Sequence, residues 1–227
     1  MSGIRPVSFR LYLITDRNAV KSASLLDACE AALQIAADLA APGTVAVQLR
    51  EKDLEAREVY ALACRLREMT TRVGAPLLVN ERVDIAVACG ADGVHLPVTS
   101  IGASAARKLL GNDRLVGVST HSAADLVAAS REAQADFAVF GPVYEPLSKG
   151  SYGVIQGAAA LFQACKTGSL PVFALGGITP ARVAELYAHP QSATLAGVAA
   201  IGSIIGAPSP RQAMRAMLGA LKVVRSS

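Results

Sequence analysis

The chain has 227 residues, of which 52% are hydrophobic and 18% charged, and its formal net charge is +4. The length suits one large hydrophobic core, and single-domain α/β barrels reach this size. The cations are scattered and only 4% of residues are aromatic, so the composition argues against a nucleic-acid surface and favours an anionic small molecule as the ligand.

Short runs rich in valine, isoleucine and leucine alternate along the chain with Ala- and Leu-rich segments. The predicted strands are RLYLIT (10–15), TVAVQLR (44–50), PLLVN (76–80), GVHL (93–96), LVGVS (115–119), DFAVFG (136–141), PVFALG (171–176) and GVAAIG (197–202). Helical spacing between them is clearest at 24–41, 54–73, 123–133 and 208–222. Eight strand–helix units predict a parallel sheet with right-handed crossovers. They fit a (β/α)₈ TIM barrel that forms one domain over residues 1–227. An open doubly wound sheet is the alternative, but no G-x-G-x-x-G motif follows the first strand.

Two features bear on the cellular compartment. No apolar run reaches the roughly 18 to 20 residues that span a bilayer, and the first residues lack the apolar stretch of a signal peptide. The cysteines stand singly, without CxxC or His/Cys clusters, at Cys29, Cys64, Cys89 and Cys165. We therefore expect a cytoplasmic protein with reduced, buried thiols and no zinc site.

The end of the second predicted strand is unusually polar. Gln48, Arg50 and Lys52 occupy alternate positions, and side chains two apart on a strand share a face. A strand buried on both faces has no structural use for an inward arginine. Catalytic groups of a barrel come from the carboxyl ends of its strands, so this row predicts a functional site.

Other strand ends carry further candidates. The third strand ends at Asn80, with Glu81 directly after it, and the fifth ends at Ser119, shortly before His121. The sixth strand runs into the long glycine-rich segment 141–157, which carries Lys149. A loop of this length inside a compact domain is usually functional or disordered, and we interpret it as a lid that brings a lysine to a bound anion.

The seventh and eighth strands both end in glycine. Gly176 and Gly177 precede Thr179, a good helix N-cap, and the eighth strand ends at Gly202, which Ser203 follows. Free backbone N–H groups before a helix N-terminus bind anions, and barrels often hold phosphate at these two loops. We therefore expect a phosphate-bearing ligand.

Seven motifs, in this order and spacing, resemble the thiamine phosphate synthase family, which includes the related thiazole tautomerases. They are LYLITD, QLREK, VNERVDIA, GADGVHL, GVSTHS, DFAVFGPVYEPLSK and PVFALGGITP. The resemblance runs from about residue 10 to 205, which is nearly the whole chain.

The resemblance implies a transferase that couples a hydroxymethylpyrimidine diphosphate with a thiazole phosphate, giving thiamine phosphate and pyrophosphate with the help of Mg²⁺. It implies that Gln48 and Asn80 contact the pyrimidine. The residues expected at the pyrophosphate are Arg50, Lys52, Lys149 and Ser119. The thiazole phosphate would be held by the backbone at Gly177, Gly202 and Ser203. Dense positive charge suits a C–O bond that ionises to release pyrophosphate.

The chain departs from the synthase pattern at the expected metal site. Glu81 replaces the usual Asp, and the GVHLGQxD pattern becomes GVHLPVTS, so that Ser100 stands in place of an Asp ligand. Mg²⁺ prefers carboxylate oxygens, which leaves Glu81 as the candidate ligand. Pro97 instead resembles the tautomerases, which need no metal, and their candidate acid/base corresponds to His121.

Three functions therefore stay open on the sequence: a synthase, which we favour; a metal-independent thiazole tautomerase; and a non-catalytic regulator that binds a phosphorylated ligand. Phosphorylated small molecules are the expected partners in each case. Nucleic-acid and membrane partners are not expected, and a homo-oligomer is left open.

Overall fold

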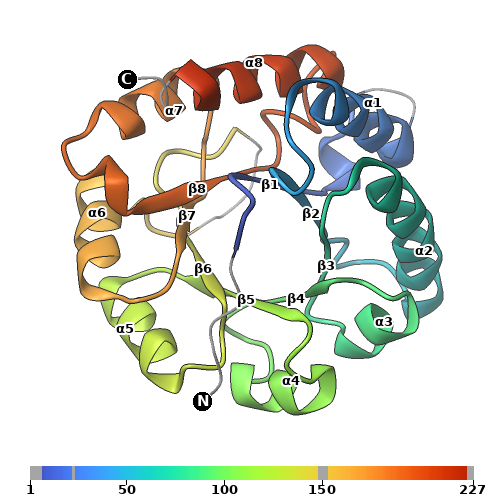
Figure 1. Cartoon of the computed structure of the whole chain (residues 1–227), viewed down its shortest axis with the longest axis horizontal. Helices are drawn as coiled ribbons and strands as arrows, with labels where there is room; N and C mark the ends of the chain where they lie inside the picture. The colour runs from blue at the N-terminus through green and yellow to red at the C-terminus, as the bar shows by residue number, and fades with distance from the viewer. Residues whose placement is uncertain (1–6, 22–23, 148–152, 224–227) are drawn as a thin grey trace.

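The computed structural model describes residues 7–21, 24–147 and 153–223. Its eight parallel strands pair in chain order and close into a barrel, with β8 beside β1, as the sequence predicts. The strands are β1 (Leu11–Ile14), β2 (Val45–Leu49), β3 (Leu77–Asn80), β4 (Gly93–Leu96), β5 (Leu115–Thr120), β6 (Phe137–Phe140), β7 (Val172–Ala174) and β8 (Leu195–Ala200). Figure 1 shows the view down the barrel, with the helices forming an outer ring.

The helices are α1 (Leu25–Leu39), α2 (Ala56–Val73), α3 (Val83–Ala88), α4 (Ala103–Leu110), α5 (Ala123–Glu132), α6 (Gly157–Thr167), α7 (Pro180–Ala188) and α8 (Pro210–Val223), with 3₁₀ turns at Arg17–Ala19 and Ser192–Thr194. Local chemistry sets several of their starts. The hydroxyls of Ser24, Ser122 and Thr179 accept a backbone N–H at the first turn of α1, α5 and α7, as N-cap residues do.

Strand boundaries differ in detail from the sequence expectation. β8 begins at Leu195, two residues earlier than predicted, and β2 ends at Leu49, so that Arg50 lies just beyond the strand. The cysteines are free thiols, but only Cys29 is fully buried; the other three are half-buried. The expectation of buried thiols was wrong for those three, because Cys64 and Cys165 lie on the partly exposed sides of α2 and α6, and Cys89 lies just after the end of α3.

The barrel has two apolar layers, one between the strands and the helices and one inside the ring of strands. Side chains such as Val45, Val47 and Leu49 point outward and pack against the helices. The barrel interior is filled by a second cluster built around Phe9, Tyr12, Phe137 and Phe173. Phe9 stacks on Phe173 with ring centroids 4.7 Å apart and meets Phe137 edge-on at 5.2 Å. This aromatic plug closes the amino-terminal end of the barrel, so an open cavity is left at the other end.

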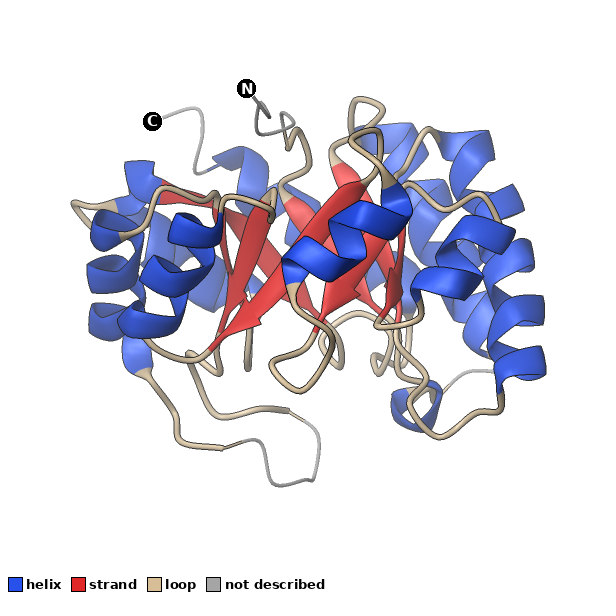
Figure 2. Cartoon of the chain, turned by 90° about the horizontal axis from the view of Figure 1, so that it is seen from below, coloured by secondary structure: helices blue, strands red, loops and turns tan. Residues whose placement is uncertain are grey.

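Figure 2 shows the barrel from the side, with the strand arrowheads on the lower side of the view. The described parts of the connection from β6 to α6, residues 141–147 and 153–156, lie on the arrowhead side of the barrel. Among the described helices, none is long and apolar enough to cross a membrane.

Candidate active site

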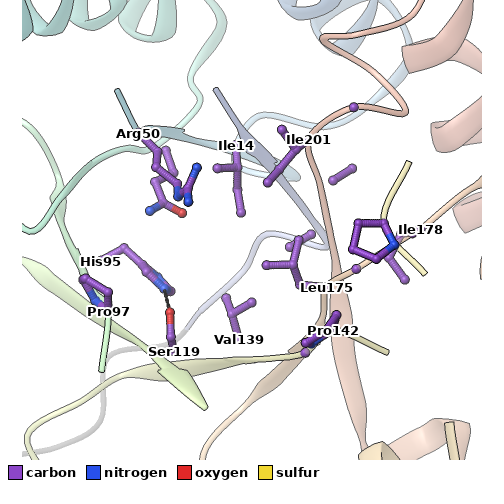
Figure 3. Close-up of a pocket in the computed structure, with 18 of the residues that line it drawn as sticks. Ile14, Arg50, His95, Pro97, Ser119, Val139, Pro142, Leu175, Ile178 and Ile201 are labelled. Atoms are coloured by element: carbon purple, nitrogen blue, oxygen red, sulfur yellow. Dashed lines mark hydrogen bonds between the residues drawn. The ribbon is translucent and has the colours of Figure 1, made fainter. Parts of the chain in front are cut away.

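A cavity of about 220 Å³ opens at the carboxyl ends of the strands. Figure 3 shows its labelled side chains pointing into a common space. Ile14, Val139, Leu175, Ile178 and Ile201 give it apolar walls. Its charged side chains, within the part of the chain that the structure describes, are the cations Arg50 and Lys52. A ligand with an apolar or aromatic body and anionic groups suits such a lining.

Gln48 lies on the inward face of β2 and is 1% exposed. Its amide nitrogen donates a hydrogen bond of 2.9 Å to Oδ1 of Asn80 at the end of β3. Oε1 of Gln48 is buried and has no hydrogen-bond partner among the described residues. A buried acceptor without a partner is costly, so the pair is arranged to receive a hydrogen-bond donor from a ligand.

Hydrogen bonds to residues just after β1 hold the backbone at Arg50 and the side chain of Glu51. The N–H of Arg50 donates to the hydroxyl of Thr15 at 2.8 Å, and this hydroxyl donates to Oε1 of Glu51 at 2.7 Å. The other oxygen of Glu51 accepts the backbone N–H of Arg17 at 3.1 Å. Burial raises the pKa of the Glu51 carboxyl, and the bonds from Thr15 and Arg17 partly oppose that shift. The network fixes where the strand ends and therefore where the Arg50 side chain starts.

His95 of β4 and Ser119 of β5 form a second pair, and His95 is the strand neighbour of Asn80. Nε2 of His95 lies 3.0 Å from Oγ of Ser119, the bond drawn as a dashed line in Figure 3. Burial, together with the charge of Arg50, lowers the pKa of His95 to about 3, so the ring is neutral. Its buried Nδ1 has no partner among the described residues, and an unpaired N–H is the rarer of the two alternatives in proteins. We therefore place the proton on Nε2, which leaves the Ser119 hydroxyl free to donate to a ligand.

His121 lines the cavity beside this pair. Its Nδ1 bonds to the backbone carbonyl of Gly141. A carbonyl only accepts, so Nδ1 carries a proton and Nε2 of the neutral ring carries the lone pair. Nε2 is therefore the ring nitrogen that stays available to a ligand.

The ends of β7 and β8 present open backbone donors. Gly176, Gly177, Gly202 and Ser203 all line the cavity. Within the described parts of the chain, the N–H groups of these four residues have no hydrogen-bond partner. Unpaired donors ahead of the α7 N-terminus make a site for an anion such as phosphate.

The structure gathers nine of the predicted site residues in this one cavity: Gln48, Arg50, Lys52, Asn80, Ser119, His121, Gly177, Gly202 and Ser203. Lys149 lies outside the described residues. The sequence reasoning did not assign a role to His95, nor to the apolar walls of the cavity. His95 sits at the end of a predicted strand, and its position there was the available signal.

The predicted metal ligand, Glu81, does not belong to the cavity lining. Glu81 is exposed, and neither it nor Ser100 lines the cavity. Among the described residues there is no group of three His, Cys, Asp or Glu side chains that could hold a metal ion. Because Mg²⁺ binds through carboxylate oxygens, these residues do not fit a protein-held magnesium site.

Fold and cavity together define a (β/α)₈-barrel protein with cations on one wall of its site and open backbone N–H groups on another. The family model described as thiamine monophosphate synthase matches residues 11–204. A Geobacter sulfurreducens protein, provisionally named thiamine-phosphate synthase, is 48% identical over 95% of both chains. The thiamine-phosphate synthase of Roseiflexus castenholzii is 38% identical over 91% of this chain and 86% of its own.

A comparison with solved structures points to the same family. The thiamine phosphate pyrophosphorylase of Pyrococcus furiosus superimposes with a TM-score of 0.79 at 26% identity, covering 96% of this chain and 98% of its own. The chain belongs to the thiamine monophosphate synthase family.

Proposed function

We propose that the protein is a thiamine-phosphate synthase, a transferase that joins hydroxymethylpyrimidine diphosphate to thiazole phosphate. The observation that carries the proposal is the cavity itself, where the Gln48–Asn80 amide pair and two cations face the open N–H groups at β7 and β8. This arrangement offers one subsite for a heterocycle with a diphosphate and a second for a phosphate. The names of the relatives and of the family support the same activity.

In this proposal the C–O bond between the pyrimidine methylene and the diphosphate breaks, and both electrons leave with pyrophosphate. The thiazole nitrogen then donates its lone pair to the pyrimidine cation and forms the new C–N bond. Arg50 and Lys52 stabilise the negative charge that develops on the leaving group. Ser119, oriented by His95, donates its hydroxyl to the same group.

The pyrimidine is held by its hydrogen-bonding edge. Oε1 of Gln48 accepts from the exocyclic amine of the ring, and the amide of Asn80 fixes the orientation of Gln48. The phosphate of the thiazole is bound by the N–H groups of Gly177, Gly202 and Ser203. Because both substrates are bound next to each other in one cavity, the attack of the thiazole nitrogen on the pyrimidine cation needs no encounter in solution.

The resemblance also implies Mg²⁺, which would supply positive charge to the diphosphate. No described carboxylate lines the cavity. The positive charge that the described cavity residues bring to the diphosphate is therefore that of Arg50 and Lys52. An ion that enters with the diphosphate would be held mainly by the substrate's own oxygens.

One observation favours a second function, the thiazole tautomerase. His121 presents a bare Nε2 to the cavity because Nδ1 bonds to the Gly141 carbonyl. Such a ring can remove a proton from one position of a thiazole and return it at another.

The test is an assay for thiamine phosphate from the two substrates, with and without Mg²⁺. The test variant is Arg50→Leu, which keeps an apolar side chain at this position but removes one cation. Product that depends on the protein and falls at least about 100-fold with Arg50→Leu supports the synthase. Absence of product would overturn it. Conversion of a thiazole carboxylate tautomer, lost in His121→Gln, would then identify the tautomerase, and tight binding without turnover would identify a regulator.

A further inference from the structure

Arg182 occupies an unusual place for an arginine. It is in the first turn of α7, after the N-cap Thr179 and Pro180. The N-terminus of a helix carries partial positive charge, so a cation there is electrostatically unfavourable. The side chain is half-buried and does not belong to the cavity lining. A cation kept at such a place needs compensating contacts.

The contacts of Arg182 join two loops at the mouth of the barrel. Nη1 donates to the carbonyl of Gly177 at 2.6 Å, and it lies 3.5 Å from the carbonyl of Glu145. The guanidinium carbon sits 4.6 Å from the centre of the Tyr144 ring, in cation–π geometry. One side chain therefore ties the turn after β7 to the first residues of the β6–α6 connection.

The turn that it holds has little freedom to place its carbonyls elsewhere. Gly176 and Gly177 both have positive φ, at 101° and 61°. The carbonyl of Gly176 accepts the N–H of Tyr144 at 3.1 Å. A Cβ at Gly177 would lie 2.3 Å from the carbonyl oxygen of Glu145 and 2.4 Å from Nη1 of Arg182. Both glycine carbonyls are therefore engaged on the side of the turn that faces the β6–α6 connection and α7.

The N–H groups of the same two residues are left without partners among the described residues, and both residues line the cavity. A peptide unit whose carbonyl is held on one side must aim the N–H of the next residue to the other. The bond from Arg182 to the Gly177 carbonyl therefore orients the peptide that carries the N–H of Ile178, which also lines the cavity. The charge of the guanidinium behind the turn further favours an anion in front of it.

We propose that Arg182 is a positioning residue for the phosphate subsite: it holds the Gly176–Gly177 turn with its N–H groups directed at the phosphate of the thiazole substrate. The inference rests on the proposed function, which places that phosphate at the turn. Arg182 touches neither substrate; it acts through the Gly177 carbonyl. Its replacement therefore weakens the binding of one substrate and spares the other.

The test measures KM for each substrate in Arg182→Leu and Arg182→Lys. A hydrogen bond from a charged group is lost in Arg182→Leu, so KM for thiazole phosphate is expected to rise roughly tenfold or more. KM for the pyrimidine diphosphate should change less than about twofold. Arg182→Lys keeps the charge and can reach one carbonyl, so it should restore part of the loss. Arg65→Leu is the control, because Arg65 lies on α2 with its side chain 70% exposed.

A second variant separates this inference from the proposed function. Among the described residues, a methyl group at Gly202 meets only Cβ of Leu147, at 3.8 Å, so Gly202→Ala should fold and take space from the phosphate. A selective rise in KM for thiazole phosphate in both Gly202→Ala and Arg182→Leu supports the inference. A rise in Gly202→Ala alone overturns the role of Arg182 and leaves the phosphate subsite standing. No rise in either variant overturns the placement of the phosphate, and the inference with it. Equal losses for both substrates in Arg182→Leu would show a merely structural role.

Discussion

Acid should destabilise this protein through His95, and a variant that lacks the histidine can separate this contribution from that of the other titrating groups. The ring is 3% exposed, and its burial, with the charge of Arg50, lowers its pKa to about 3. In the unfolded chain a histidine titrates near 6.5. As the pH falls below about 6.5, the unfolded state takes up a proton that the folded state refuses until about pH 3. Stability is therefore complete above that range and is lost progressively as the pH falls from about 6.5 to about 3.

The loss of unfolding free energy follows from the distance between the two pKa values of His95, about 6.5 in the unfolded chain and about 3 in the folded protein. Each pH unit inside it is worth about 1.4 kcal/mol of unfolding free energy for one group. Between pH 7.5 and 5.0 the protein crosses about 1.5 units of the window, so His95 should remove about 2 kcal/mol. That is a large fraction of the roughly 5–15 kcal/mol by which a typical domain is stable.

The assay is equilibrium urea unfolding of the wild type and of His95→Gln at both pH values. Glutamine does not titrate and can still donate to Ser119 Oγ, while all carboxylates contribute equally to both proteins. The stability advantage of the wild type over the variant should shrink by about 2 kcal/mol on acidification. A difference that stays constant within about 0.5 kcal/mol would refute the reasoning, because burial would then not keep His95 neutral.

Three further outcomes follow from single contacts. Gln48→Leu should lower kcat/KM by about 100-fold, because it removes the acceptor for the ligand, and should cost about 1 kcal/mol of stability, because it removes the donor to Asn80 Oδ1. Steady-state kinetics and urea unfolding measure the two effects, and unchanged kinetics would show that Gln48 is not part of the site. Gly177→Ala should destabilise the fold by about 1–3 kcal/mol, because its φ is 61° and its Cβ would meet the Glu145 carbonyl; an unchanged melting temperature would contradict this. Asp136→Asn should cost about 3 kcal/mol in urea unfolding, because it breaks a buried ion pair whose acidic side chain is 4% exposed; a loss below about 1 kcal/mol would show that the pair is not needed.

Much of the site could be predicted because a parallel barrel brings all strand ends to one rim. Gln48 and Arg50 stand at alternate positions of a run whose other side chains are apolar, and period-two spacing directed them to one face. The glycines after β7 and β8 were found for the same reason, since backbone N–H groups at adjacent strand ends converge whatever the side chains are.

Other parts of the site carried no such local signal. Arg182 looks like a surface residue of an amphipathic helix, and only its contact with the Gly177 carbonyl gives it a role. The apolar wall residues, such as Ile14 and Val139, could not be singled out, because every strand of the barrel is rich in similar apolar residues. Glu81 stands at the end of β3 like Asn80, but the backbone there turns to a φ of 64°, and the carboxylate lies outside the cavity lining.

The sequence by itself determined the order of strands and helices, the closed barrel and the polar residues at its carboxyl rim, because these follow from periodicity and from the chain direction of parallel strands. Only the tertiary structure decided which polar groups are paired and which face the ligand. Tautomers of His95 and His121, the free acceptor of Gln48 and the anchoring of the β7 turn by Arg182 depend on atoms many residues apart. Hydrogen bonds act over about 3 Å, and distances of that order between remote residues exist only once the barrel has closed.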